Sequence, residues 1–163
     1  PEVSWFEMTK AADLCFEDLH VGMVRSFAHA FTDAEIDTFG QLSGDLSPLH
    51  TSDAYSADQT CYRKRLVHGM HLAALTSGLI GMRLPGMRSV CLSQSFDFKQ
   101  PVYAGDEVEV MGEVIGKDEA TRTVTLRTSV KQGDQLCVRG KALVRVLDSE
   151  WKPEHESTPG QEG

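Results

Sequence analysis

An aspartate and a histidine five residues apart are the first candidates for chemistry in this sequence. Asp45 and His50 flank a bend, because Pro48 keeps the preceding Ser47 out of helical geometry. Such a bend can turn a carboxylate and an imidazole toward one point, where they can hold a water and exchange a proton near neutral pH. The spacing alone favours a simpler interpretation, in which Asp45 caps a turn and His50 caps the next helix.

The second candidate segment is Leu66-Val67-His68-Gly69-Met70, which precedes a strongly apolar stretch. The first amides of a helix have no internal partner and lie at its positive end. Gly69 would let a substrate oxygen approach them, forming an oxyanion hole without a side chain, or it would only allow a tight helix entry. His68 and His71 could suggest a metal together with Asp45, but they lack the H-E-x-x-H form, so we expect no metal.

Two further features could take part in a site. Ser77 lies in the apolar stretch, where its hydroxyl either bonds the preceding helical turn or faces the Asp45 loop. Arg63-Lys64-Arg65 is the only tight basic run, and it is either a solvated loop or a contact for a phosphate-bearing substrate tail. The chain has no G-x-S-x-G motif, P-loop or dinucleotide fingerprint.

The elements that must position these residues change character along the chain. In the first half, residues 32–35 have the form of a capping box, Gly44 can end that helix, and a short helix is expected from Ser52. Residues 70–82 are apolar on almost every face, which predicts a helix surrounded by protein. In the second half, strands are predicted at 89–99, 107–110, 123–126 and 141–146.

Antiparallel strands with one polar face need a cover for the apolar face, and only residues 70–82 are apolar enough to provide it. We therefore expect an α+β fold, in which a curved antiparallel sheet wraps around one long helix. The single folded domain should span residues 16–147. A loosely ordered lead-in is expected over 1–15 and a flexible tail over 148–163.

The composition excludes several classes of protein. A net charge of −8 and a 40% hydrophobic content exclude global disorder and argue against nucleic acids or anionic membranes as partners. Four scattered cysteines fit a reducing compartment. The apolar stretches are too short to span a membrane, and no secretory signal is visible. We therefore expect a cytoplasmic protein.

The chain resembles the MaoC-like dehydratases, above all the (R)-specific enoyl-CoA hydratases, in two ordered motifs. These are Gly44-Asp45-Leu46-Ser47-Pro48-Leu49-His50 and Leu66-Val67-His68-Gly69-Met70, and the resemblance extends over about residues 17–147. It implies a hot-dog fold, in which an antiparallel sheet wraps a long helix. It also implies a homodimer whose two sheets join edge to edge, with substrate entering near the subunit boundary.

The resemblance also implies roles for individual residues. Asp45 and His50 match the catalytic pair, and the Gly69 amide matches the donor that polarises the thioester carbonyl, with His68 beside it. Ser77 matches a serine of the active-site pocket. Ser47 stands where the family usually has asparagine, and we expect its hydroxyl to keep a role in the turn.

The implied reaction is the reversible hydration of trans-2-enoyl thioesters to (R)-3-hydroxyacyl thioesters, carried on coenzyme A or acyl carrier protein, with no metal or redox cofactor. Thioester hydrolysis on the same fold is an alternative, but the Asp-to-His spacing followed by His-Gly favours the hydratase. A non-catalytic subunit that binds acyl thioesters is a third interpretation, and the intact Asp45 and His50 pair counts against it.

Overall fold

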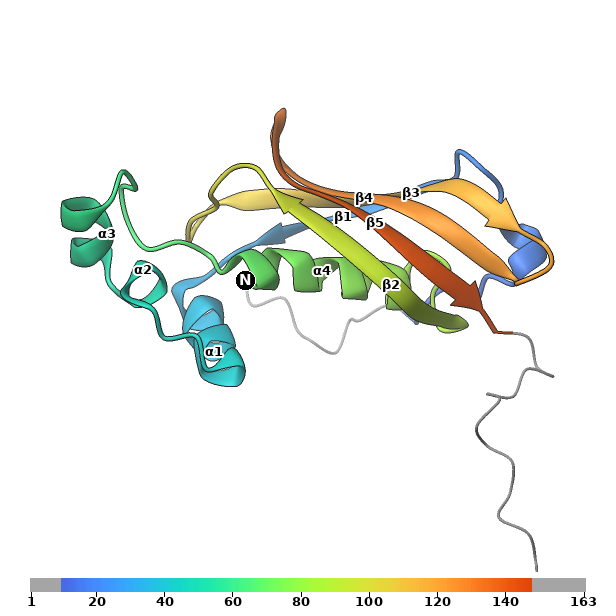
Figure 1. The fold of residues 1–163 in the computed structure, drawn as a ribbon, viewed down its shortest axis with the longest axis horizontal. Coiled ribbons are helices and arrows are strands. Elements are labelled where there is room, and N and C mark those ends of the chain that lie inside the picture. Colours follow the sequence, from blue (N-terminus) through green and yellow to red (C-terminus); the bar gives the residue numbers. More distant parts are fainter. Residues whose placement is uncertain (1–9, 148–163) are drawn as a thin grey trace, which may run out of the picture.

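The computed structural model describes residues 10–147, in which one antiparallel sheet curves around a central helix (Figure 1). The strands are β1 (Val24–Ala30), β2 (Ser89–Phe98), β3 (Glu107–Asp118), β4 (Thr123–Gln132) and β5 (Gln135–Val146), in the sheet order β1-β3-β4-β5-β2. The helices are α1 (Asp33–Ser43), α2 (Pro48–Thr51), α3 (Asp53–Gln59) and α4 (Gly69–Met82), and a short 3-10 helix, η2, covers Phe16–Asp18. The predicted arrangement of a sheet around a helix is confirmed.

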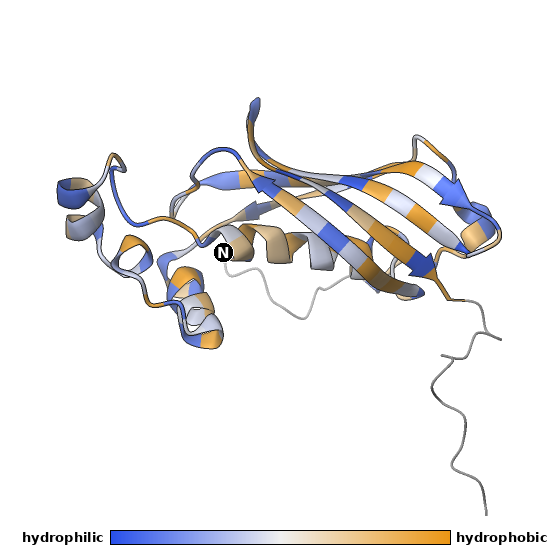
Figure 2. Cartoon of the chain, viewed as in Figure 1, coloured by the Kyte–Doolittle hydropathy of each residue, from blue (hydrophilic) through white to orange (hydrophobic). Residues whose placement is uncertain are grey.

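The sheet packs on α4 because apolar residues alternate along its strands, visible as bands in Figure 2. In β3, Val108 and Val110 are buried, whereas Glu107 and Glu109, which alternate with them, face solvent. The helix lies tightly against this strand at Gly112, where a Cβ atom would lie 2.7 Å from a methyl group of Leu79. The absence of a side chain at this position therefore allows the tight contact between α4 and the sheet.

Four strands lie where the sequence predicts them, but three of them run further than the predicted segments. The polar–apolar alternation fades within β3, where the register with β4 shifts between Val114 and Gly116. A second shift lies between Cys91 and Ser93 in β2. Such irregularities bend a strand and help the sheet to curve around the helix. The sequence does not predict β1, because residues 24–30 show no clean alternation.

The prediction that α4 is surrounded by protein is wrong for one side of the helix. Leu72 and Leu79 are buried against the sheet, but Met70 is 59% exposed, and Ala74 and Ser77 also face outward. The physical reason is that the sheet covers one side only, while α1, α2 and α3 gather beyond the N-terminal end of α4 (Figure 1).

The predicted helix signals around α1 are confirmed. The Glu35 amide donates to Thr32 Oγ1 at 3.2 Å, and the Thr32 amide donates to Glu35 Oε2 at 2.8 Å, which completes the capping box. Gly44 ends α1 in the left-handed conformation, with φ of 76°. Pro48 then begins the single turn of α2, which the sequence does not predict inside the bend.

Residues 12–14 differ from the loosely ordered lead-in that the sequence predicts over 1–15. The Ala12 amide donates to the Met82 carbonyl, and the Met87 amide donates to the Ala12 carbonyl, both at 2.9 Å. These bonds hold the segment against the end of α4. Residues 1–9 and the predicted tail at 148–163 lie outside the described residues. Within 10–147, none of the helices combines the length and the apolar character needed to cross a membrane.

Candidate active site

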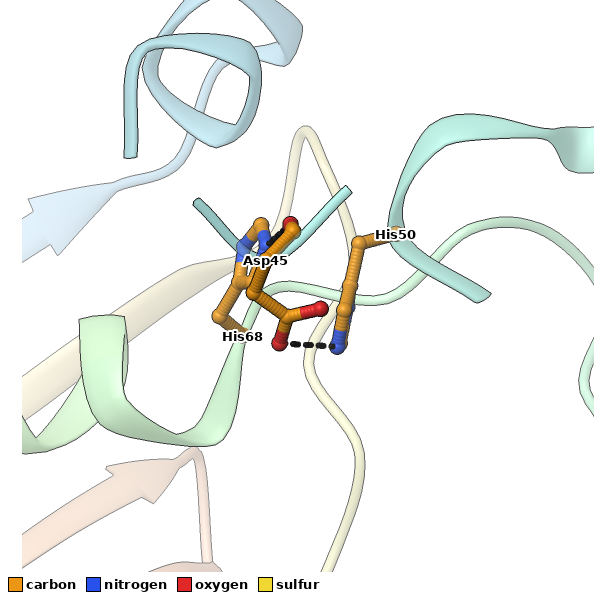
Figure 3. A group of neighbouring side chains, drawn as sticks. All are labelled: Asp45, His50 and His68. Atoms are coloured by element: carbon orange, nitrogen blue, oxygen red, sulfur yellow. Dashed lines mark hydrogen bonds and ion pairs between the residues drawn. The ribbon is translucent and has the colours of Figure 1, made fainter. Parts of the chain in front are cut away.

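Asp45 follows Gly44, the residue that ends α1, and two hydrogen bonds fix its position. Its amide donates to Ser43 Oγ at 3.2 Å, and its Oδ1 atom accepts a hydrogen bond from the Ser47 amide at 3.2 Å. The carboxylate is 52% exposed. With Oδ1 engaged in the turn, Oδ2 is the oxygen that faces His50 (Figure 3).

Ser47 takes part in this turn through its backbone, not through its hydroxyl as predicted. Its amide binds the Asp45 side chain, and its carbonyl accepts a hydrogen bond from the His50 amide at 2.8 Å. Any residue other than proline offers the same two backbone groups. The replacement of the family's asparagine by serine therefore leaves these two contacts intact.

His50 lies in α2 with a side chain that is only 13% exposed. Its Nδ1 atom is 3.0 Å from the carbonyl oxygen of Leu66, which can only accept a hydrogen bond. We therefore assign the proton of the neutral ring to Nδ1. The other ring nitrogen, Nε2, then carries a lone pair and points toward Asp45.

The two functional groups face each other across 3.7 Å, measured from His50 Nε2 to Asp45 Oδ2. This separation exceeds an ordinary hydrogen bond, and neutral histidine and ionised aspartate would both be acceptors here. A water can satisfy both at once by donating one hydrogen to each. Its oxygen lone pairs would then point away from the pair, which is the orientation that a nucleophile requires. The bend thus brings Asp45 and His50 together, although the spacing alone favours the simpler interpretation, and Asp45 also caps the turn as that interpretation holds.

His68 is almost fully buried and supports both members of the pair. Its Nε2 atom donates to the backbone carbonyl of Asp45 at 2.9 Å, which holds the loop that carries the carboxylate. Its ring stacks on the ring of His50 with the centroids 3.9 Å apart (Figure 3). His68 thus holds the backbone of Asp45 and packs against the ring of His50, whereas the sequence analysis places it beside the oxyanion hole.

Gly69 begins α4 and lines the same cavity as His50. The cavity has a volume of about 210 Å³ and is otherwise bounded largely by apolar side chains, including Leu72 and Phe98. The first intrahelical bonds of α4 come from the amides of residues 71 and 72, so the Gly69 amide precedes them. A donor at the positive end of a helix is therefore available beside the imidazole.

The donor set of Asp45, His50 and His68 lies within 4.8 Å, but its geometry does not suit a metal ion. Imidazole lone pairs lie in the ring plane, and these two rings are stacked within 23° of parallel, so their lone pairs do not converge. His71 does not join them, because its ring stacks on Phe39 with the centroids 4.7 Å apart. Burial lowers the pKa of His71, which favours its neutral form.

Ser77 is not brought to this cavity. It lies two turns beyond Gly69 on the exposed side of α4, away from the Asp45 loop and from the residues that line the cavity. Within the described chain, Ser77 therefore does not orient the Asp45 carboxylate, which is held by the Ser47 amide instead.

Only part of the basic run Arg63-Lys64-Arg65 is exposed where a phosphate could bind. Arg65 is only 14% exposed and is paired with two carboxylates of α1, and Lys64 donates to a backbone carbonyl. Arg63 is 64% exposed, with its guanidinium 4.3 Å above the ring of Tyr103. The structure thus separates the three residues that the sequence groups together.

Two functional groups are missed by sequence reasoning. The Leu66 carbonyl sets the tautomer of His50, and a backbone group leaves no mark in the sequence. The ring of Phe98 lies 3.2 Å from where a Cβ of residue 69 would stand, so it forms a wall beside the Gly69 amide. Phe98 could have been suggested from the sequence only by its apolar side chain near the end of the strand predicted at 89–99.

Comparison with known proteins places the whole site within a matching region. A family model described as a MaoC like domain matches residues 20–134. The (R)-specific enoyl-CoA hydratase of Aeromonas caviae is 42% identical over 131 residues, covering 80% of this chain and 97% of that protein. The 3-hydroxybutyryl-CoA dehydratase of Methylorubrum extorquens is 36% identical over 137 residues, covering 84% of this chain and 87% of that protein.

A solved structure shares the fold over nearly the same region. The R-hydratase PhaJ1 from Pseudomonas aeruginosa superimposes with a TM-score of 0.79 at 29% identity, covering 88% of this chain and 96% of that one. The hot-dog fold predicted from the motifs is thereby confirmed.

Proposed function

Because this chain belongs to the MaoC-like dehydratase family, we propose that it catalyses the reversible hydration of trans-2-enoyl thioesters to (R)-3-hydroxyacyl thioesters. One observation carries the proposal: Asp45 Oδ2 and His50 Nε2 face each other across 3.7 Å, beside a cavity that His50 shares with Gly69. The names of the two enzyme relatives, an enoyl-CoA hydratase and a 3-hydroxybutyryl-CoA dehydratase, describe the two directions of this chemistry.

The geometry supports a reaction in which one water adds across the double bond. The water held by Asp45 and His50 attacks C3 of the enoyl thioester and loses a proton to the pair. The electrons of the C2–C3 double bond move toward the thioester oxygen, where the Gly69 amide stabilises the developing negative charge. C2 then takes up a proton from the pair. The product contains the substrate plus one water, so no electrons are exchanged with a redox cofactor.

Hydrolysis of the thioester would need the same water to reach the carbonyl carbon. The Gly69 amide binds the carbonyl oxygen in either reaction, so the position of the water relative to the acyl chain decides between them. A subunit that only binds acyl thioesters would need neither group of the pair. Retention of both groups in a water-binding geometry therefore counts against a subunit that only binds acyl thioesters.

The test is incubation of the protein with crotonyl-CoA while enoyl absorbance and free thiol are followed together. We expect the absorbance to fall without thiol release, and chiral analysis to give the (R)-3-hydroxybutyryl thioester. Thiol release at the rate of absorbance loss would establish hydrolysis instead. Saturable binding with neither change would leave a non-catalytic binding subunit. Coenzyme A and carrier-protein thioesters of C4 to C12 acyl chains, compared in one panel, would identify the carrier and the chain length.

We further propose that two copies associate as a symmetric homodimer. The edge strand β2 carries exposed apolar side chains, with Leu92 46% and Phe98 49% exposed. The exposed side of α4, with Met70 and Ser77, would gain cover from a second copy. A second copy there would also place Ser77 at the subunit boundary, near which the substrate is expected to enter. Light scattering at micromolar concentration should give twice the monomer mass, and the monomer mass would contradict this.

For the substrate tail, we propose that Arg63 provides the cationic contact, rather than the whole basic run. Its guanidinium is the most exposed of the three and has only a long contact of 3.5 Å with Asp106 Oδ1, whereas Lys64 and Arg65 make shorter contacts within the protein. A solvent-exposed ion contact contributes about 0–1 kcal/mol, so Arg63→Gln should raise KM at most a few-fold. The effect should vanish at high salt and leave kcat unchanged. An unchanged KM at low salt would exclude the contact.

A further inference from the structure

Arg65 joins three segments near the site although it does not line the cavity. Its Nη2 atom lies 2.6 Å from Asp33 Oδ1 and its Nη1 atom lies 2.6 Å from Asp37 Oδ1. Its backbone amide donates to Asp53 Oδ1, at the start of α3, at 2.9 Å. The hydrogen bond with Asp33 is the largest of the contacts that raise the pKa of Arg65, so the guanidinium stays charged.

These contacts lead to both members of the catalytic pair. The helix α1 carries the two aspartates that bind Arg65, and Asp45 follows the end of the same helix. On the other side, Arg65 is joined to Leu66, whose amide donates to the Leu49 carbonyl at 3.0 Å. The Leu66 carbonyl is the acceptor for His50 Nδ1. Arg65 therefore connects the helix that carries the carboxylate to the peptide that orients the imidazole.

We propose that Arg65 is a positioning residue for the catalytic pair. By holding α1 against the segment before α4, it fixes the separation of Asp45 and His50 and keeps the Leu66 carbonyl on His50 Nδ1. Arginine suits this task because its planar fork reaches two carboxylates through different nitrogens, whereas the point charge of lysine does not reproduce that geometry. The proposal rests on the hydratase function proposed above.

The test compares Arg65→Gln with the parent protein. A misplacement of about 1 Å can cost about 10²-fold in rate, so we expect kcat to fall roughly 10- to 100-fold. KM should stay within about twofold, because Arg65 does not line the cavity. Nitrogen-15 NMR of the imidazole rings should show His50 protonated at Nδ1 in the parent and in mixed tautomers in the variant. Arg65→Lys should recover part of kcat.

Two further variants separate positioning from general stability. Arg127→Gln is the matched control, because Arg127 also binds a carboxylate at 2.6 Å, that of Glu113, but on the sheet and away from the site. We expect it to leave kcat unchanged. Asp37→Asn should lower kcat in the parent, yet add little in the Arg65→Gln background, because both changes break the same contact.

Three results would overturn the proposal: parental kcat in Arg65→Gln, an equal fall in the Arg127→Gln control, or unaltered His50 signals in the Arg65 variant. Failure of the parent to hydrate any coenzyme A or carrier-protein thioester of the C4 to C12 panel would instead overturn the proposed function. The NMR comparison would still report whether Arg65 orients His50, since it needs no substrate.

Discussion

Replacement of Asp45 by asparagine is the sharpest test of how the pair works. The amide oxygen of asparagine can still accept the hydrogen bond from the Ser47 amide, so the turn should survive. The new NH2 group would take the place of Oδ2, opposite His50 Nε2. At 3.7 Å it is too far to bind the imidazole lone pair, and, unlike the carboxylate oxygen, it cannot accept a hydrogen bond from a water between the two groups. The substitution therefore removes the basic carboxylate and also removes one of the two acceptors that hold the water.

The expected loss follows from these two effects. A positioned acid–base group contributes roughly 10²–10⁴-fold, which is about 3–5 kcal/mol of transition-state stabilisation. We expect Asp45→Asn near the upper end, because the base and an acceptor for the water are lost together. KM should change little, since Asp45 does not line the cavity. The free energy of unfolding should stay within about 0.5 kcal/mol, because the side chain is half exposed and its turn contact is retained.

The assay is initial-rate hydration of crotonyl-CoA, with thermal unfolding of each variant measured in parallel. Asp58→Asn is the matched control, since Asp58 is an exposed aspartate of α3 and the charge change is the same. An Asp45→Asn protein that retained more than about a tenth of the parental kcat would refute the assignment of the carboxylate. A comparable loss in the Asp58 control would show that net charge, not the pair, sets the rate.

Three further outcomes are expected. His50→Ala should lower kcat by roughly 10²–10⁴-fold. Its circular dichroism spectrum should match that of the parent, which would show that the fold is retained. Gly69→Ala should lower kcat/KM at least about tenfold, because its methyl group would lie 3.2 Å from the Phe98 ring and would displace the Gly69 amide. Loss of an oxyanion-hole donor costs about 10²-fold or more, so partial displacement should cost less. A parental kcat/KM would refute this. The hydrogen bond with Arg122 lowers the pKa of Glu17 to about 2. The contribution of the ionised Glu17 to stability is therefore fully present above the ordinary pKa of glutamate and is lost as the pH falls toward 2. The melting temperature of Glu17→Gln should therefore lie below the parent's at pH 7 and converge with it near pH 2, whereas a constant gap would contradict the linkage.

Side-chain patterns made most of the fold predictable. The capping box at Thr32, the stop at Gly44 and the apolar run of α4 each depend on residue types that act locally, so the sequence records them. The pairing of Asp45 with His50 followed from a proline-induced bend and from the family motif. The exposed side of α4 was not predictable in the same way, because an apolar helix has the same sequence pattern whether all of its surface or only one side of it is covered by its own sheet.

The Arg63-Lys64-Arg65 run shows a different limit. Three adjacent cations look equivalent in the sequence, but their partners lie far away along the chain, and a loop can direct each side chain separately. Arg65 meets carboxylates of α1 about thirty residues earlier, while Arg63 remains largely exposed. Only the folded arrangement separates a cation that is held between two carboxylates, such as Arg65, from one that is mostly exposed, such as Arg63.

The parts of the site that escape sequence reasoning are backbone groups. The Leu66 carbonyl sets the tautomer of His50, the Asp45 carbonyl anchors His68, and the Gly69 amide is the candidate oxyanion donor. Each belongs to a junction between a loop and a helix, where backbone groups lack regular partners. The contacts that hold the loops and helices together at these junctions set the positions of the backbone groups, whereas the side chains of the same residues do not. This explains why Ser47 can replace asparagine without loss of the turn, since Asp45 binds its amide and not its side chain.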